Sequence, residues 1–267
     1  MQLEKNGKLI KDVKFKKKKI AIIFSDETKI EISQNTFAHF YLYKGKEVSE
    51  DELIQIEEED QLSSLKAYTL NILSRTMYSQ KEIEDKLIKK GISKKIIEKI
   101  TKYLKEFNFI NDEKYCSLLV EEYTNKNYGK ERIIQNLMKK GIDEKILSNI
   151  SFEEDEEEEK AKKLVKRYCL NNKNKSFQKI KDSCYAFLLN KGFSYSLASK
   201  VIKDVEQYVY KEDDIEILKS KFEKYVILHQ IDLLDQKQKE KTIRHFINQG
   251  FSYEDIKSQI KEETWKS

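Results

Sequence analysis

One six-residue pattern occurs four times in this chain of 267 residues: two apolar residues, two polar residues, a glycine and a further apolar residue. The four copies are Leu87–Ile92, Leu137–Ile142, Leu188–Phe193 and Phe246–Phe251, so the glycines recur at nearly regular intervals. Serine or aspartate stands two positions after each glycine. Glycine accepts the left-handed conformation that ends a helix, and serine or aspartate caps the next one. The pattern therefore predicts four breaks between consecutive helices.

Turn-forming residues are scarce. Proline is absent, although an average usage of about 5% predicts about 13 residues, and only seven glycines occur. Such a chain favours helices over sandwiches or propellers. A three-helix unit of about 50 residues buries only a modest core, so such units are usually stacked in tandem. We predict a mainly α fold, in which tandem three-helix, helix-turn-helix-like repeats form an elongated, curved array.

The segment 1–60 has a different pattern and predicts a small β-rich module. Asn6-Gly7 is a hairpin signal. Short runs of β-type residues follow at 13–15, 20–24 and 29–32. Helices are expected over 35–43 and over 51–58, the second capped by Ser49. The first repeat predicts helices over 63–75, 79–90 and 93–107.

These patterns predict five segments. The β-rich module covers 1–60, and the four repeats cover 61–110, 111–152, 153–210 and 211–267. The net charge is −2 over 1–60, +6 over 61–150, −6 over 151–160 and +7 over 161–267. The helical body is therefore basic apart from one acidic patch. Such a field attracts nucleic acid or an acidic protein surface, although for most individual lysines a solvated lysine-rich surface is the favoured interpretation.

Arginine is rare, and each of the four arginines falls in a different repeat. A guanidinium group forms bidentate contacts that lysine cannot form, so retained arginines are candidate contacts, although chance also distributes four residues in this way. With the lysines near the repeat turns, the predicted partner-binding residues are Arg75, Lys90, Lys130, Arg132, Lys140, Arg167 and Arg244.

Recognisable catalytic motifs are missing from the sequence. It contains no nucleotide-binding glycine loop, no metalloprotease helix and no serine-hydrolase elbow. The histidines (His39, His229, His245) lie apart in sequence, and the cysteines (Cys116, Cys169, Cys184) predict neither a disulfide framework nor a zinc site. The acidic run Glu153–Glu159 could chelate a cation, but it also suits the start of a helix. We expect no enzymatic activity, no cofactor and no metal.

Membrane and export signals are also missing, since no apolar run approaches the ~18 residues of a membrane helix and residues 1–8 lack a signal-peptide core. We expect a monomeric, cytoplasmic protein.

Several motifs with fixed spacings resemble the RecX family. They are Leu73–Ile83, Leu87–Ile92, Phe109–Tyr115, Tyr128–Ile133 and Leu137–Ile142. The resemblance is close over residues 65–150 and looser in the third and fourth repeats. The β-rich module resembles the extension of RecX proteins of Gram-positive type. Family members often carry basic residues where Thr76 and Tyr78 stand here, and proline where Lys130 stands.

The resemblance implies a regulator of the RecA recombinase in DNA repair, recombination and the SOS response. RecX-like proteins bind the RecA filament on single-stranded DNA and limit its ATP hydrolysis, strand exchange and co-protease activity. Two other hypotheses stay open: a direct DNA-binding protein that uses its basic helix-turn-helix-like face, and a helical scaffold for another protein. Tight binding to DNA without RecA in a gel-shift titration across salt concentrations would favour the first of these. Capture of an unrelated partner and no RecA from a lysate would favour the second.

Overall fold

The computed structural model describes residues 7–266, and side chains up to residue 263. The chain divides into two compact units. The first comprises Met1–Cys116 with the short segment Lys140–Ile142, and the second comprises Ser117–Lys139 with Asp143–Ser267. Across the described residues, no helix is both long enough and apolar enough to cross a bilayer.

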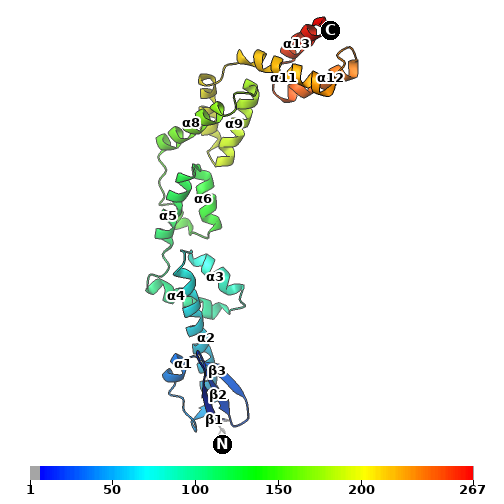
Figure 1. Ribbon diagram of the computed structural model, residues 1–267. Coiled ribbons are helices and arrows are strands. Elements are labelled where there is room, and N and C mark those ends of the chain that lie inside the picture. The colour runs from blue at the N-terminus through cyan, green and yellow to red at the C-terminus, as the bar shows by residue number, and fades with distance from the viewer. Residues whose placement is uncertain (1–6, 267) are drawn as a thin grey trace, which may run out of the picture. The chain divides into compact units, whose positions relative to one another are not determined.

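The first unit begins with a four-stranded antiparallel sheet of order β3-β2-β1-β4 (Figure 1). The strands are β1 (Gly7–Phe15), β2 (Ile20–Phe24), β3 (Lys29–Ile32) and β4 (Glu47–Ser49). The predicted bounds of β2 and β3 are confirmed, whereas β1 begins earlier than expected and β4 was not predicted. Asn6 lies outside the described residues, and Gly7 is the first residue of β1.

The sheet packs its apolar side chains, among them Ile10, Ile22 and Phe24, with residues from α1 (Gln34–His39) and the following helix. That helix, α2 (Glu50–Leu73), corrects the sequence analysis, which predicted two separate helices over 51–58 and 63–75. The Ser49 side chain caps α2 as expected, by accepting a hydrogen bond of 3.1 Å from the backbone N–H of Glu52.

A single helix forms in place of the two predicted ones because α2 contributes buried side chains to two separate cores. Its N-terminal half buries Ile56 among the residues of the sheet, and its C-terminal half buries Leu65 in the core of the first repeat. Between them, the buried Asp60 carboxylate accepts hydrogen bonds from the backbone N–H of Ser33 (2.6 Å) and the hydroxyl of Thr36 (3.0 Å). No glycine or proline interrupts the segment.

The first repeat is completed by α3 (Gln80–Ile88) and α4 (Lys94–Glu106), both inside the predicted spans. Its core is formed by Leu65, Ile83, Leu87, Ile97, Ile100, Leu104 and Ile110. The next helix, α5 (Asp112–Asn125), begins in the first unit and continues into the second.

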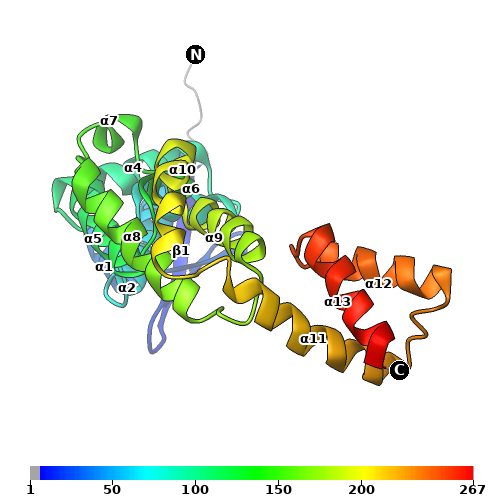
Figure 2. The same ribbon diagram turned by 90° about the horizontal axis from the view of Figure 1, so that it is seen from above.

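The second unit contains the remaining helices. They are α6 (Lys130–Lys139), α7 (Glu144–Leu147), α8 (Glu154–Leu170), α9 (Phe177–Lys191), α10 (Tyr195–Val201), the 3-10 helix η1 (Ile202–Gln207), α11 (Asp213–His229), α12 (Gln236–Asn248) and α13 (Tyr253–Lys266). The α8–η1 segment encloses one apolar core, and α11, α12 and α13 enclose another. The last three helices form the gold-to-red group of Figure 2.

The repeated glycines have the conformation predicted for them. Their φ angles are +76° at Gly91, +75° at Gly141, +87° at Gly192 and +87° at Gly250. Leu87, Leu137 and Tyr115 are buried.

Candidate functional site

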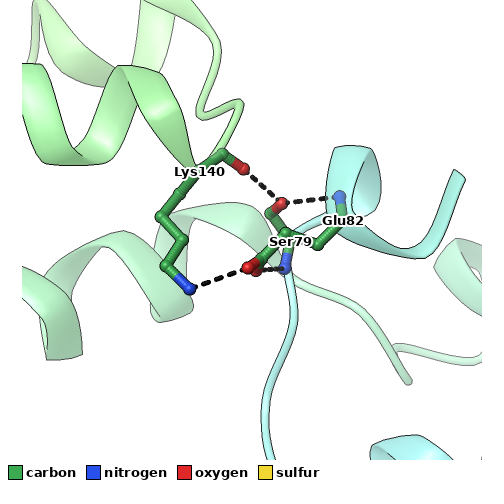
Figure 3. Close-up of polar contacts among 3 residues, drawn as sticks. All are labelled: Ser79, Glu82 and Lys140. Atoms are coloured by element: carbon green, nitrogen blue, oxygen red, sulfur yellow. Dashed lines mark hydrogen bonds and ion pairs between the residues drawn. The ribbon is translucent and has the colours of Figure 1, made fainter. Parts of the chain in front are cut away.

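The first repeat is joined to the turn of the second by a polar junction (Figure 3). The Ser79 hydroxyl donates a hydrogen bond of 2.5 Å to the carbonyl oxygen of Lys140, and it accepts one of 3.1 Å from the backbone N–H of Glu82. The Glu82 carboxylate accepts from the backbone N–H of Ser79 and forms an ion pair of 2.7 Å with Lys140 Nζ. The next backbone N–H, that of Gln80, donates to Asp112 Oδ1 at 2.9 Å.

The third and fourth repeats are joined in the same way. The Ser176 hydroxyl donates a hydrogen bond of 2.5 Å to the carbonyl oxygen of Gln249 and accepts one from the backbone N–H of Lys179. The next backbone N–H, that of Phe177, donates to Asp214 Oδ1 at 2.7 Å. The serine and aspartate contacts of the first junction therefore have equivalents here, whereas the two contacts of the Glu82 carboxylate do not, because Lys179 stands in the place of Glu82.

Glycine takes the place of the serine at the junction between the second and third repeats. The backbone N–H of Gly129 donates a hydrogen bond of 2.8 Å to the carbonyl oxygen of Lys191. The N–H of Lys130 donates to Glu157 Oε2 at 3.0 Å. A Cβ atom at Gly129 would lie 2.4 Å from the carbonyl oxygen of Gly192. Direct contact between the two backbones therefore requires glycine at position 129.

The three junctions share one chemical feature. The first N–H groups of a helix have no partner within that helix, and at each junction a carboxylate from the next repeat accepts one of them. The acids are Asp112, Glu157 and Asp214. Burial raises the pKa of the Asp112 and Asp214 carboxyls above the ordinary value. This role was not predicted from the sequence, because acidic residues are too common in the chain for these three to stand out.

Two of the predicted partner-binding residues take part in the junctions through their side chains, and Lys130 does so through its backbone N–H. Lys140 forms the ion pair with Glu82. Arg132 donates from its guanidinium group to the carbonyl oxygen of Asn190, and the same group lies 4.2 Å from the centre of the Tyr128 ring. Both side chains therefore support the contact between repeats, whatever else they bind.

The other predicted residues are exposed. Lys90 Nζ lies 4.5 Å from the centre of the Tyr68 ring, and Lys130 Nζ lies 5.8 Å from the Phe152 ring. The remaining three are distributed over separate repeats: Arg75 follows α2, Arg167 lies on α8 and Arg244 lies on α12. Lys130 and Arg132 both lie in the first turn of α6 but contact different residues.

Among the described residues, no set of three or more His, Cys, Asp or Glu side chains is arranged to hold a metal ion. The acidic run predicted to start a helix does so, since α8 begins at Glu154.

Two histidines that lie apart in sequence contact the same tyrosine in the fourth repeat. The centres of the His229 and His245 rings lie 4.5 and 4.3 Å from the centre of the Tyr225 ring. Burial lowers the pKa of His245.

Comparisons with known proteins agree with this architecture. The models of the first, second and third three-helix domains of RecX match residues 66–104, 111–149 and 155–202. The chain is 31% identical over 267 residues to "Regulatory protein RecX" of Streptococcus agalactiae serotype III (strain NEM316), covering 92% of this chain and 96% of the relative.

A second relative is "Regulatory protein RecX" of Lactococcus lactis subsp. lactis (strain IL1403), 29% identical over 248 residues, with 91% of this chain and 92% of the relative covered. Among solved structures, "Crystal structure of regulatory protein RecX" superposes with a TM-score of 0.58 at 24% identity, covering 73% of this chain and 99% of that one. This last similarity concerns the fold.

Proposed function

The chain belongs to the RecX family, and we propose that it regulates a RecA recombinase, mainly as a negative modulator. In this proposal it binds the RecA filament on single-stranded DNA and limits ATP hydrolysis, strand exchange and co-protease activity in recombination and SOS repair. The observation that carries the proposal is the match, over nine-tenths of the chain, to relatives named as regulatory proteins.

The arrangement of the basic side chains supports binding by many weak contacts. The exposed Arg75, Lys90, Lys130, Arg167 and Arg244 are distributed over the repeats, and we propose that each contacts acidic protein surface or phosphate. An exposed ion pair is worth little alone, but linked sites raise the effective concentration of one another. Arg132 and Lys140 are also predicted contacts.

The proposal predicts that the protein, added at less than one copy per RecA, slows RecA ATP hydrolysis that depends on single-stranded DNA. Replacing Arg75 and Lys90 together by alanine is expected to raise the concentration required for half-inhibition about two- to fivefold, because two exposed charged contacts are lost. The matched control is Lys173→Ala with Lys203→Ala, which removes two exposed lysines that form no ion pair in the described part of the chain.

The two possible failures have different meanings. If the unaltered protein at equimolar concentration leaves RecA ATP hydrolysis unchanged, the proposed function is wrong. If the unaltered protein inhibits and the Arg75/Lys90 variant inhibits equally well, the assignment of these two contacts is wrong and the function stands.

A further inference from the structure

The sheet of the first unit is strongly basic, although the segment 1–60 as a whole is not. Residues 7–49, which contain all four strands, carry ten lysines and five acidic residues. Residues 50–60, at the start of α2, carry seven acidic residues and no basic one. The net charge of −2 over residues 1–60 thus combines a basic sheet with an acidic helix start.

The positive charge is densest at the turn between β1 and β2. We call residues Phe15–Lys19 the basic hairpin; its lysines are consecutive, and all five residues are exposed. The backbone N–H of Lys16 donates to the carbonyl oxygen of Lys19 at 2.9 Å and closes the turn. Within the described residues, Lys17 and Lys18 form no ion pair.

Glu31 is the acidic residue that faces this turn, and it does not neutralise it. Its carboxylate pairs with both Lys16 and Lys29. Hydrogen bonds from these two lysines lower the pKa of Glu31 to about 2, so that it is ionised at neutral pH. Because this single carboxylate is shared between two ammonium groups, the basic hairpin keeps an excess of positive charge.

An aromatic ring lies beside these lysines. The Phe15 side chain is 71% exposed, at the end of β1. Its ring centre lies 5.7 Å from that of Phe37, with the ring planes at 75° to each other. This edge contact holds the Phe15 ring in place, while most of the ring is exposed to solvent. Exposed aromatic rings among lysines are typical of surfaces that bind single-stranded nucleic acids, where bases stack on rings and phosphates contact cations.

We propose that the basic hairpin binds single-stranded DNA, with Phe15 stacking on an unpaired base and Lys16–Lys19 contacting the phosphate backbone. An acidic peptide would satisfy the lysines but offers no flat ring system for Phe15. A DNA duplex offers phosphates, but its bases are already stacked on one another. The proposal goes beyond the regulation of RecA, because this contact requires no recombinase.

The experiment measures binding of a labelled oligothymidylate by fluorescence anisotropy, without RecA, over a series of salt concentrations. The paired variant Lys17→Ala with Lys18→Ala is expected to weaken binding at low salt. It is also expected to reduce the slope of log K against log[salt] by about 1.4, because each phosphate contact on a single strand contributes about 0.7. Lys173→Ala with Lys203→Ala removes the same charge elsewhere and should leave the slope unchanged.

Phe15→Ala tests the stacking contact. Loss of one stacked base is expected to weaken binding to the oligothymidylate about 5- to 150-fold, without a change in the salt slope. The control is Tyr195→Ala on α10, which removes a side chain that is 70% exposed. Phe15→Ala should have no effect on the weaker binding of a duplex of the same length. Glu31→Gln, which releases two ammonium groups, should strengthen binding to the oligothymidylate.

The proposal is overturned if the Lys17/Lys18 variant keeps the affinity and the salt slope of the unaltered protein. It is also overturned if Phe15→Ala binds the oligothymidylate normally. Loss of affinity for RecA alone, with DNA binding intact, would assign the basic hairpin to an acidic protein surface instead. Because no RecA is present in the DNA titration, its result is independent of the ATPase test of the proposed function.

Discussion

Replacing Gly192 by alanine is expected to destabilise the second unit by about 2–5 kcal/mol. The φ angle of +87° requires the left-handed conformation, which costs an alanine about 1–2 kcal/mol. The added Cβ would also lie 2.2 Å from the Cβ atom and 2.5 Å from the backbone nitrogen of Arg132. Overpacking of this kind typically costs a further 1–3 kcal/mol, because the backbone of α6 must move to relieve it.

Gly91 provides the matched control. It has nearly the same backbone conformation, with φ of +76°, but a Cβ atom there would meet nothing within 4 Å. Gly91→Ala should therefore cost only the conformational part, about 1–2 kcal/mol. Urea denaturation followed by far-ultraviolet circular dichroism measures both variants. Equal losses at the two positions would show that the turn at Gly192 is not packed against α6.

The second large effect is expected at Asp214. Replacement by alanine leaves the backbone N–H of Phe177 without its acceptor, and loss of a hydrogen bond to a charged group costs about 1.5–3 kcal/mol. Asp214→Asn keeps an oxygen acceptor at the same place and should preserve most of the free energy of unfolding. Asp213→Asn, a neighbouring exposed residue on α11, is the control for the change of charge.

The pH dependence of Asp214→Asn follows from the direction of the pKa shift. Burial raises the pKa of Asp214 in the folded protein above the ordinary value of 3.8. Ionisation is therefore harder in the folded than in the unfolded chain, and the resulting loss of stability develops as the pH rises from 3.8 through the folded-state value. Relative to the unaltered protein, Asp214→Asn should gain stability from pH 3.8 towards neutrality. A constant difference across that range would contradict the assignment.

Local patterns in the sequence were sufficient to predict the repeat turns and two of the strands. The glycine turns follow from a conformation that few other residues adopt, and β2 and β3 follow from short runs of β-type residues bounded by a polar turn. Strand β4 has only three residues, and of these Val48 alone is fully buried. So short a pattern is not distinguishable from a loop until its pairing with β1 is known.

The features that sequence reasoning missed depend on contacts between distant residues. The two halves of α2 bury different faces because each belongs to a different core, so no single apolar stripe runs through the helix. The junction between Ser79 and Lys140 joins residues 61 positions apart. The basic character of the sheet was not predicted, because the net charge was summed over residues 1–60, which include both the strands and the acidic start of α2.

The continuity of α2 couples the thermodynamics of the two parts that it joins. Cleavage of the chain at residue 60 would divide the helix between Ile56 and Leu65. Each core would then be packed against only a short helical segment with a frayed end. The sheet and the first repeat should therefore melt in one cooperative transition, and protection of the α2 amides from hydrogen exchange should be lost in a single step.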